Sequence, residues 1–323
     1  MYTVTLIPGD WIGPECCAIM QQVVAKTGVD ISWDVHAIEN GVLSQSLLDS
    51  CTKNKVIFKA KVDAPRKLGV LPPTLQLRKA LGMWASVRPV RALPSINAKF
   101  TNIDVVLVRE ISEDIFSGFE HEVTENVYEA VKITTPEGCE RIARYAFEYA
   151  RANGRKKVTI AHKSNIMKQS DGLFLRVAKK VAEEYPEIQT KDAIVDALCM
   201  QLVRWADDFD VLLSPNLFGD ILSDLCSGLG GGITASPSAC YGNGMALFET
   251  LHGNAPDLVQ QNKANPIPVL NTAIMMLEHL GEKDAANKIQ SAIDLTVQKG
   301  IKTFDLGGTA TTTEVGQAII DHL

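Results

Sequence analysis

Short apolar runs alternate with longer amphipathic segments along this chain, and that alternation predicts an α/β fold. Runs of strand length end at turn or polar residues, and the longer segments show the 3.6-residue period of helices. The predicted strands are 2–7, 56–61, 83–88, 103–109, 157–161, 192–196 and 210–214. The predicted helices are 15–26, 43–51, 75–82, 137–153, 171–184, 198–205, 267–280 and 283–298, with one more opening at Asp220.

Two segments depart from this pattern. Residues 119–135 alternate weakly between apolar and polar positions and carry many charges, which predicts a projecting β-arm. Such arms commonly join subunits. The stretch from Phe248 to Asp257 is rich in polar and turn-forming residues and is predicted to be a loop.

Composition narrows the classes of partner. The 323 residues are 46% hydrophobic, which is enough for a sizeable core, and the length favours two domains or one elaborated α/β unit. The net charge of −6 argues against a nucleic-acid backbone or an anionic membrane as the partner. A small-molecule enzyme fits better.

The cysteines and the N-terminal segment predict a cytoplasmic protein. The seven cysteines are odd in number and scattered, with no C-x-x-C pair, so neither a disulfide framework nor a zinc site is indicated. The first residues lack the basic flank, apolar core and cleavage site of a signal peptide. No apolar stretch approaches the roughly 20 residues of a membrane span.

Two aspartates are the first candidates for chemistry. Asp220 and Asp224 lie four apart on a predicted helix that follows the buried strand 210–214, so their carboxylates share a helix face and form an oxygen-only ligand pair. Alternatively, they are first-turn carboxylates favoured by the helix dipole. No G-x-G-x-x-G follows any predicted strand, so any nicotinamide site is not a Rossmann site.

Several motifs together make the chain resemble the β-decarboxylating dehydrogenases, the isocitrate and isopropylmalate dehydrogenase family. The resemblance runs nearly end to end and is closest to the NAD-dependent isocitrate dehydrogenase branch. The motifs are Ile7-Pro-Gly-Asp10, Ile12-Gly-Pro-Glu15, Leu77-Arg78, Val87-Arg88-Pro89, Val108-Arg-Glu110, Glu120-His-Glu-Val123, His162-Lys163-Ser-Asn-Ile-Met-Lys168, Asn216 to Asp224, His252-Gly-Asn-Ala-Pro-Asp257 and Asn265-Pro266.

The resemblance implies an isocitrate/isopropylmalate dehydrogenase-like fold, with two α/β domains around a cleft and a projecting β-arm. It places 1–90 and 232–323 in a large, cofactor-side domain. Residues 91–231 would form a small domain with the metal site, the arm and the dimer interface. The expected assembly is a homodimer or a higher oligomer.

The resemblance also implies a substrate and metal site for a hydroxy di- or tricarboxylate. The planar guanidiniums of Arg78, Arg88 and Arg109 match those that bind malate carboxylates, although surface salt bridges are the alternative for each arginine. Thr74 falls in the loop that grips the substrate's variable arm.

The expected metal is Mg²⁺ or Mn²⁺, held by Asp220 and Asp224 with Asp196 of the partner subunit. Lys163, also reaching across from the partner, matches the lysine that helps remove the hydroxyl proton. A merely solvated lysine is the alternative.

The same resemblance implies NAD as the cofactor. His252, Gly253 and Asn265 match residues around the adenine. Asp257 can accept hydrogen bonds from ribose hydroxyls and would repel a 2′-phosphate, which favours NAD over NADP.

Several positions depart from the family pattern. Phe116 stands where the family has its catalytic tyrosine, whose hydroxyl is the expected proton donor to the enol. Pro72 and Thr74 stand where the isocitrate branch has serine and asparagine. Trp11 replaces a glycine beside the cofactor loop, and Ile111 replaces the asparagine after the Arg-Glu pair.

Two hypotheses follow. The chain is an NAD- and metal-dependent dehydrogenase acting on isocitrate or another 3-substituted malate, or it is a catalytically impaired regulatory subunit that still binds ligand. Lys163, Asp196, Asp220 and Asp224 favour the first hypothesis. Phe116 favours the second.

Overall fold

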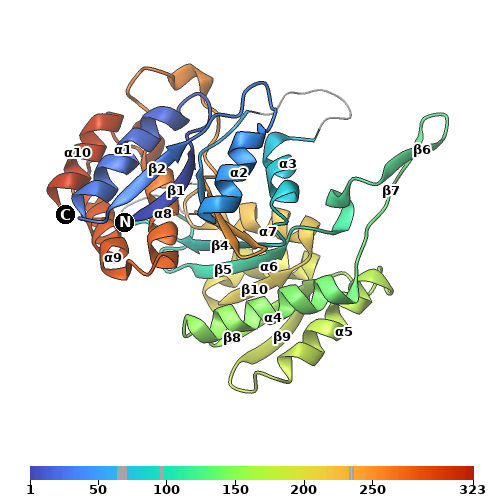
Figure 1. The fold of residues 1–323 in the computed structure, drawn as a ribbon. Coiled ribbons are helices and arrows are strands. Elements are labelled where there is room, and N and C mark those ends of the chain that lie inside the picture. Colours follow the sequence, from blue (N-terminus) through green and yellow to red (C-terminus); the bar gives the residue numbers. More distant parts are fainter. Residues whose placement is uncertain (64–70, 95–97, 233, 235) are drawn as a thin grey trace. The chain divides into compact units, whose positions relative to one another are not determined.

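The chain divides into two compact α/β units, each built from separate stretches of sequence. The computed structural model describes residues 1–323 except 64–70, 95–97, 233 and 235 (Figure 1). Unit 1 contains Met1–Met83, Ala92–Thr101 and Gly230–Leu323, and unit 2 contains Trp84–Arg91 and Asn102–Leu229. No helix in the described part of the chain is both long and apolar enough to cross a membrane.

Unit 1 is a mixed sheet covered by helices. β1 pairs in parallel with β2 and β3, β12 is parallel to β3, and β11 is antiparallel to β12. In sheet order the strands are β2 (Ile31–Val35), β1 (Tyr2–Ile7), β3 (Val56–Lys59), β12 (Met245–Glu249) and β11 (Ser238–Gly242). The helices are α1 (Gly13–Lys26), α2 (Gln45–Asn54), α3 (Pro73–Ala80), α8 (Ile267–His279), α9 (Lys283–Gln298) and α10 (Thr312–Asp321).

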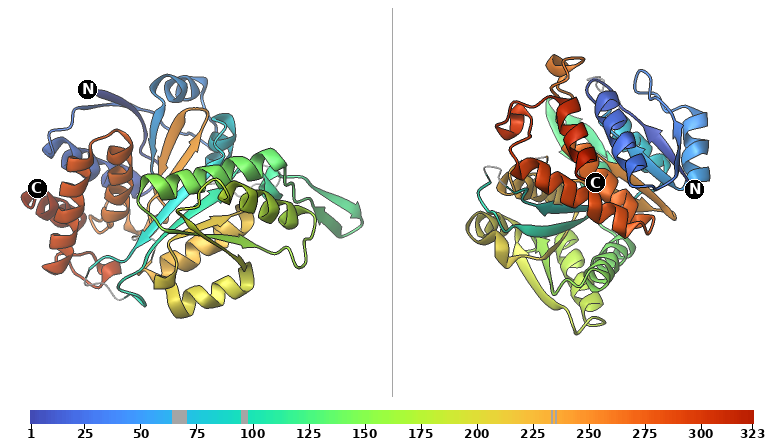
Figure 2. Two further views of the ribbon diagram at one scale, coloured as in Figure 1. Left: turned by 90° about the horizontal axis from the view of Figure 1, so that it is seen from below. Right: turned by 90° about the vertical axis from the view of Figure 1, so that its left-hand side faces the viewer.

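The core of unit 1 lies where α1 and α8 meet the sheet. Val4, Phe58 and Phe248 of the strands belong to the same buried cluster as Met20 of α1 and Leu270 of α8. α1, α8, α9 and α10 pack on one another (Figure 2). The candidate cofactor residues lie between β12 and α8, in a segment whose Ala255, Leu258 and Ala264 pack in or against this core.

Unit 2 brings four parallel strand ends to one edge. Its strands, in order, are β4 (Ala85–Arg91), β5 (Asp104–Glu110), β10 (Val211–Ser214), β8 (Lys157–His162) and β9 (Gln189–Ile194). β5, β10, β8 and β9 are parallel, whereas β4 is antiparallel to β5. The helices are α4 (Pro136–Ala152), α5 (Ser170–Ala182), α6 (Val195–Trp205) and α7 (Asn216–Leu229).

The predicted β-arm is confirmed as a two-stranded hairpin of β6 (Glu120–Thr124) and β7 (Val127–Ala130). Every residue of both strands is exposed, and apolar side chains are among them. Exposed apolar side chains on a narrow hairpin are typical of a segment that pairs with another chain.

Most predicted elements are confirmed, with boundaries shifted by a few residues. The prediction missed β2, α10 and the β11–β12 hairpin, and it treated Phe248 and Glu249 as loop although both belong to β12. The predicted domain boundary after residue 90 also differs from the boundary between the units. β4 belongs with unit 2 because all seven of its residues pair with β5.

The prediction that a helix opens at Asp220 is wrong, because α7 begins at Asn216. Pro215 precedes the helix, where a missing N–H costs nothing. Gly219 remains helical within α7. A Cβ there would lie 2.6 Å from Arg109 Cγ, so the position requires glycine for a close approach and not for a turn. The first turn therefore holds no acidic residue, and the helix-dipole explanation of Asp220 and Asp224 fails.

The close approach of Gly219 to Arg109 gives a stability prediction. Gly219→Ala should destabilise the protein by about 1–3 kcal/mol, because the new methyl group would force the buried Arg109 side chain to move. The control is Gly228→Ala on the same helix, where nothing lies within 4 Å of the added Cβ. Alanine there should be neutral or stabilise by up to about 1 kcal/mol. Urea unfolding measures both effects, and equal effects would contradict the steric argument.

Candidate active site

A buried arginine ties β5 to the start of α7. Arg109 is 1% exposed, and its Nε and Nη2 donate to Asn216 Oδ1 at 3.0 and 2.6 Å. Its Nη1 donates to Asp220 Oδ1. The register that sets Ser214 of β10 beside Arg109 of β5 brings these residues together. The guanidinium thus points to the helix face that carries the candidate metal ligands.

A second arginine reaches the same helix. Arg88 of β4 is 5% exposed, and its Nη1 donates to Ser223 Oγ at 2.5 Å and lies 4.0 Å from Asp220 Oδ1. Asp220 keeps 48% of its side chain exposed, and Asp224, one turn further on, is exposed. The structure therefore brings together Arg88, Arg109, Asp220 and Asp224 within unit 2.

Arg78, the third predicted substrate arginine, lies in unit 1 and has a carboxylate partner there. Its Nε donates to Glu249 Oε1 at 3.2 Å and its Nη2 to Glu249 Oε2 at 2.5 Å. Both side chains are nearly buried, and the two hydrogen bonds form the bidentate geometry that a guanidinium and a carboxylate prefer. Thr74 lies in the first turn of α3, the helix that carries Arg78, and is half-buried.

Lys163 and Asp196 form a separate pair. β8 and β9 run in parallel, with His162 opposite Ile194, so the residues after the two strands meet at one edge. Lys163 Nζ donates to Asp196 Oδ1 at 2.6 Å, and this hydrogen bond lowers the pKa of Asp196. No group of three or more His, Cys, Asp or Glu residues in the described part of the chain is arranged to hold a metal ion.

Phe116 lies against the arginine cluster. It belongs to a 3₁₀ turn over Asp114–Ser117, and its ring centroid is 5.0 Å from Arg109 Cζ. The stacking places the Phe116 ring beside the guanidinium that also binds Asp220 and Asn216. An aromatic side chain at this position is therefore next to the predicted substrate and metal residues.

A pocket of about 510 Å³ in unit 1 contains three of the predicted cofactor residues, His252, Gly253 and Asn265. His252 is 6% exposed, and its Nδ1 lies 2.9 Å from the Gly253 carbonyl oxygen, so Nδ1 carries the proton and donates. Burial lowers the pKa of His252. Its buried Nε2 has no hydrogen-bond partner among the described residues, and a neutral imidazole leaves that nitrogen free to accept.

Asp257, the fourth predicted cofactor residue, is exposed and is not among the residues that line this pocket. It follows Pro256 in a short 3₁₀ turn, and the next residue, Leu258, does line the pocket. The pocket has an acidic residue that the sequence prediction missed, Asp305, which accepts from Asn265 Nδ2 at 2.9 Å.

The likeness to known proteins extends over the whole chain. The family model described as isocitrate/isopropylmalate dehydrogenase matches residues 3–319. This match spans both units. The chain belongs to the isocitrate/isopropylmalate dehydrogenase family.

Named relatives within this family are of both catalytic and regulatory kinds. The chain is 43% identical to "Isocitrate dehydrogenase [NAD] catalytic subunit 5, mitochondrial" of Arabidopsis thaliana, over 99% of this chain and 88% of the relative. It is 42% identical to a mitochondrial regulatory subunit of isocitrate dehydrogenase [NAD] from Dictyostelium discoideum, over 99% of this chain and 91% of the relative. A crystal structure of isocitrate dehydrogenase from Methylococcus capsulatus matches with a TM-score of 0.95 at 40% identity, covering 100% of this chain and 99% of that one.

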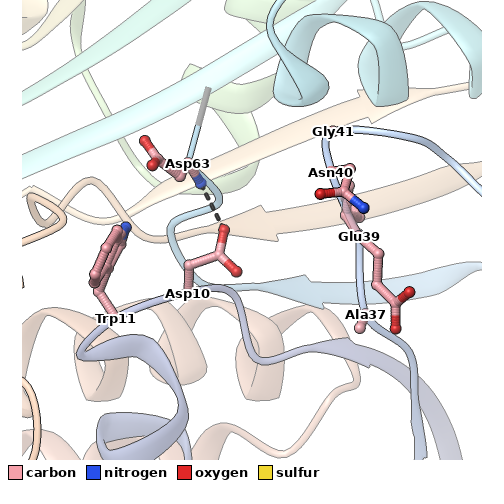
Figure 3. A pocket seen from close by; sticks show the side chains of 8 residues that line it. Asp10, Trp11, Ala37, Glu39, Asn40, Gly41 and Asp63 are labelled. Carbon is pink, nitrogen blue, oxygen red and sulfur yellow. Dashed lines mark hydrogen bonds between the residues drawn. The ribbon is translucent and has the colours of Figure 1, made fainter. Parts of the chain in front are cut away.

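Trp11, which departs from the family's glycine, lines a different hollow from His252. A pocket of about 720 Å³ in unit 1 is formed by Asp10, Trp11, Asp63 and 37–41 (Figure 3). Asp10 Oδ2 accepts from the Asp63 backbone N–H at 2.8 Å, and the indole stands beside that pair with 45% of Trp11 exposed. The indole is therefore not part of the wall around His252 and Asn265.

Sequence reasoning also missed several partners of the predicted residues. Asn216 and Ser223 were inside a recognised motif and Glu249 was in the predicted loop 248–257, and none of them received a role, although each one binds a predicted arginine. A buried arginine needs a hydrogen-bond acceptor. Polar residues in or near the motifs were therefore the available sequence signal for these partners. Which acceptor each arginine uses depends on strand pairing, which the motifs do not encode.

The backbone at Trp11 gives a second stability prediction. Its φ is 56°, in the left-handed region that costs a non-glycine residue about 1–2 kcal/mol. Trp11→Gly and Trp11→Ala both remove the indole, so the glycine variant should be more stable by about 1 kcal/mol. Thr27, with φ of −71°, is the matched control, and there the glycine variant should be the less stable one. Thermal unfolding of the four variants measures this, and the same Ala–Gly order at both sites would refute it.

Proposed function

We propose that this protein catalyses the NAD- and Mg²⁺- or Mn²⁺-dependent oxidative decarboxylation of a 3-substituted malate, isocitrate or a close analogue. The observation that carries the proposal is the cluster in unit 2, where two buried guanidiniums converge on Asp220, on the helix that also carries the exposed Asp224. Guanidinium groups beside carboxylate ligands suit a substrate that carries carboxylates and also chelates a metal ion. The family and its NAD-named relatives support the same reaction.

The donor set fits a hard divalent cation. Asp220 and Asp224 offer oxygen atoms on one helix face, with solvent access at both side chains. When bound, the metal would act as a Lewis acid that lowers the pKa of the substrate hydroxyl. Arg88 and Arg109 would bind and orient the substrate carboxylates. Lys163 would take the hydroxyl proton at Nζ.

The pocket around His252 fits the adenine end of NAD. His252 Nε2 is a buried acceptor without a partner in the described structure, and an exocyclic amino group is the donor that such a nitrogen lacks. Glycines and apolar side chains line much of the remaining wall, which suits a flat ring. The Asp257 carboxylate would accept hydrogen bonds from the ribose hydroxyls. This role rests on the sequence motif from His252 to Asp257.

The two polar clusters support an oligomer. Lys163 and Asp196 pair with each other, apart from Asp220 and Asp224, so each chain would contribute one pair to its own site and one to its partner's. We therefore propose at least a homodimer with shared sites. Cytoplasmic localisation stays a prediction, and the two named relatives described above are mitochondrial proteins.

A second function is that of a catalytically impaired regulatory subunit. Phe116 places a ring without a hydroxyl beside Arg109, and the enol would then lack its expected proton donor. The similarity to the regulatory relative is nearly equal to that with the catalytic one. Retention of Lys163, Asp196, Asp220 and Asp224 makes the dehydrogenase the first choice.

Restoring the missing hydroxyl separates these two functions. If only the final protonation is impaired, Phe116→Tyr should raise turnover within the ~10²–10⁴-fold range of one general acid, with little change in substrate or metal binding. The measurement is NADH formation from isocitrate, homoisocitrate, isopropylmalate and malate. Phe119→Tyr, on an exposed side chain of the arm, is the matched control and should change nothing.

A regulatory protein would respond differently. Its defects would include Pro72 and Thr74, so one hydroxyl would rescue nothing. No NADH from either the native chain or Phe116→Tyr, despite tight substrate binding, would support the regulatory function.

Cofactor preference gives a further prediction. Asp257→Lys should weaken NAD⁺ binding and improve NADP⁺ binding, because the acidic side chain no longer repels a 2′-phosphate. Fluorescence titration with each dinucleotide measures both affinities, and Asp30→Lys at another exposed position is the charge-matched control. If the native protein binds NADP⁺ at least as well as NAD⁺, the role given to Asp257 is wrong.

A further inference from the structure

A fully buried carboxylate in unit 2 has no place in the proposed reaction. Asp171 is 0% exposed and lies in the first turn of α5. A first-turn carboxylate usually accepts from the N–H groups of its own helix. Asp171 Oδ2 instead accepts from the backbone N–H of Lys163 at 2.6 Å, eight residues earlier in the chain.

This hydrogen bond completes the support of the Lys163 main chain. The Lys163 carbonyl oxygen accepts from the N–H groups of Ile166 and Met167 at 3.0 and 2.9 Å. The preceding residue, His162, is the last of β8 and pairs with β9. Both backbone polar groups of Lys163 are thus occupied, and the Cα from which its side chain projects toward Asp196 is fixed.

A buried carboxylate needs a compensating charge, and Lys132 supplies it. Lys132 follows β7 at the base of the arm, and its Nζ lies 3.5 Å from Asp171 Oδ1. The same Nζ lies 2.8 Å from Asp114 Oδ2, and that carboxylate oxygen accepts from the Leu217 N–H at the start of α7. One ammonium therefore joins the segment that holds Lys163 to the segment that starts the Asp220 helix.

We propose that Asp171 is a positioning residue for Lys163, with the Lys132 ammonium as its counter-charge. The proposal rests on the proposed function for the role of Lys163 in proton transfer. The hydrogen bond to a carboxylate is of the charge-assisted kind, stronger than one between neutral groups, so its loss frees the Lys163 backbone. The Lys163 side chain then samples orientations that miss the substrate hydroxyl.

Hydrogen exchange tests this positioning without any ligand. In the full-length protein, Asp171→Ala should speed exchange of the Lys163 amide by roughly tenfold or more, as expected for losing a hydrogen bond to a charged group. Asp171→Asn keeps an acceptor oxygen and should fall between native and alanine rates. Asp114→Asn is the control, because it disturbs the same Lys132 ammonium but leaves the Asp171–Lys163 hydrogen bond in place. Its Lys163 amide should exchange near the native rate.

Kinetics supply the second readout. With isocitrate, NAD⁺ and Mn²⁺, Asp171→Ala should lower kcat at nearly unchanged KM, and Asp171→Asn should recover part of the loss. If the alanine variant does not fold, the asparagine variant carries both measurements. A native exchange rate at Lys163 in a folded Asp171 variant, or unchanged kcat with faster exchange, would overturn the proposal. Should the native chain prove inactive, the proposed function fails and the exchange comparison alone decides the positioning role.

Discussion

The buried guanidinium of Arg109 is the constraint on which the architecture of unit 2 depends. Its charge is removed from water, and the cost of that burial is recovered by hydrogen bonds to Asn216 and Asp220. α7 must therefore begin early enough to present Asn216 and must carry glycine at position 219, where the arginine chain passes. Arg109 thus sets the position of the helix face that carries both aspartates.

The parallel strands of unit 2 explain why functional side chains gather without being near in sequence. β5, β10, β8 and β9 end at the same edge, where open α/β sheets bind their ligands. Arg109, Lys163 and Asp196 each lie at or just after one of these strand ends. They nevertheless form two clusters in one chain, and the proposed function therefore requires a second chain to bring Lys163 to the aspartate pair.

The sequence predicted the α/β class, most elements and the arm, because these depend on local periodicity and turn residues. The prediction failed at positions where contacts between distant parts of the chain determine the local structure. The sequence places the helix start at Asp220 because Pro215 and Gly219 are common turn residues, whereas Gly219 lies within α7 and makes room for the Arg109 side chain of β5. The β11–β12 hairpin was missed although Asn243-Gly244, with both φ angles positive, is a typical hairpin turn.

The candidate site was predicted from motifs, and the structure adds the partners that motifs leave out. Asn216, Glu249 and Asp171 bind the predicted residues through pairings of strands and helices far apart in sequence. Trp11 illustrates the opposite case. Its left-handed backbone fits the glycine of the family pattern, yet its side chain lines a pocket that the motif does not describe.

Complementation between two inactive variants measures the central claim, that each metal site takes Asp196 from one chain and Asp224 from the other. Asp196→Ala and Asp224→Ala should each abolish Mn²⁺ binding in the presence of isocitrate. Co-expression of the two variants should restore roughly a quarter of the native sites, because half of randomly paired dimers are mixed and each mixed dimer has one intact site of two. No recovery of Mn²⁺ binding in purified mixed dimers, or native binding by either variant alone, would contradict the account.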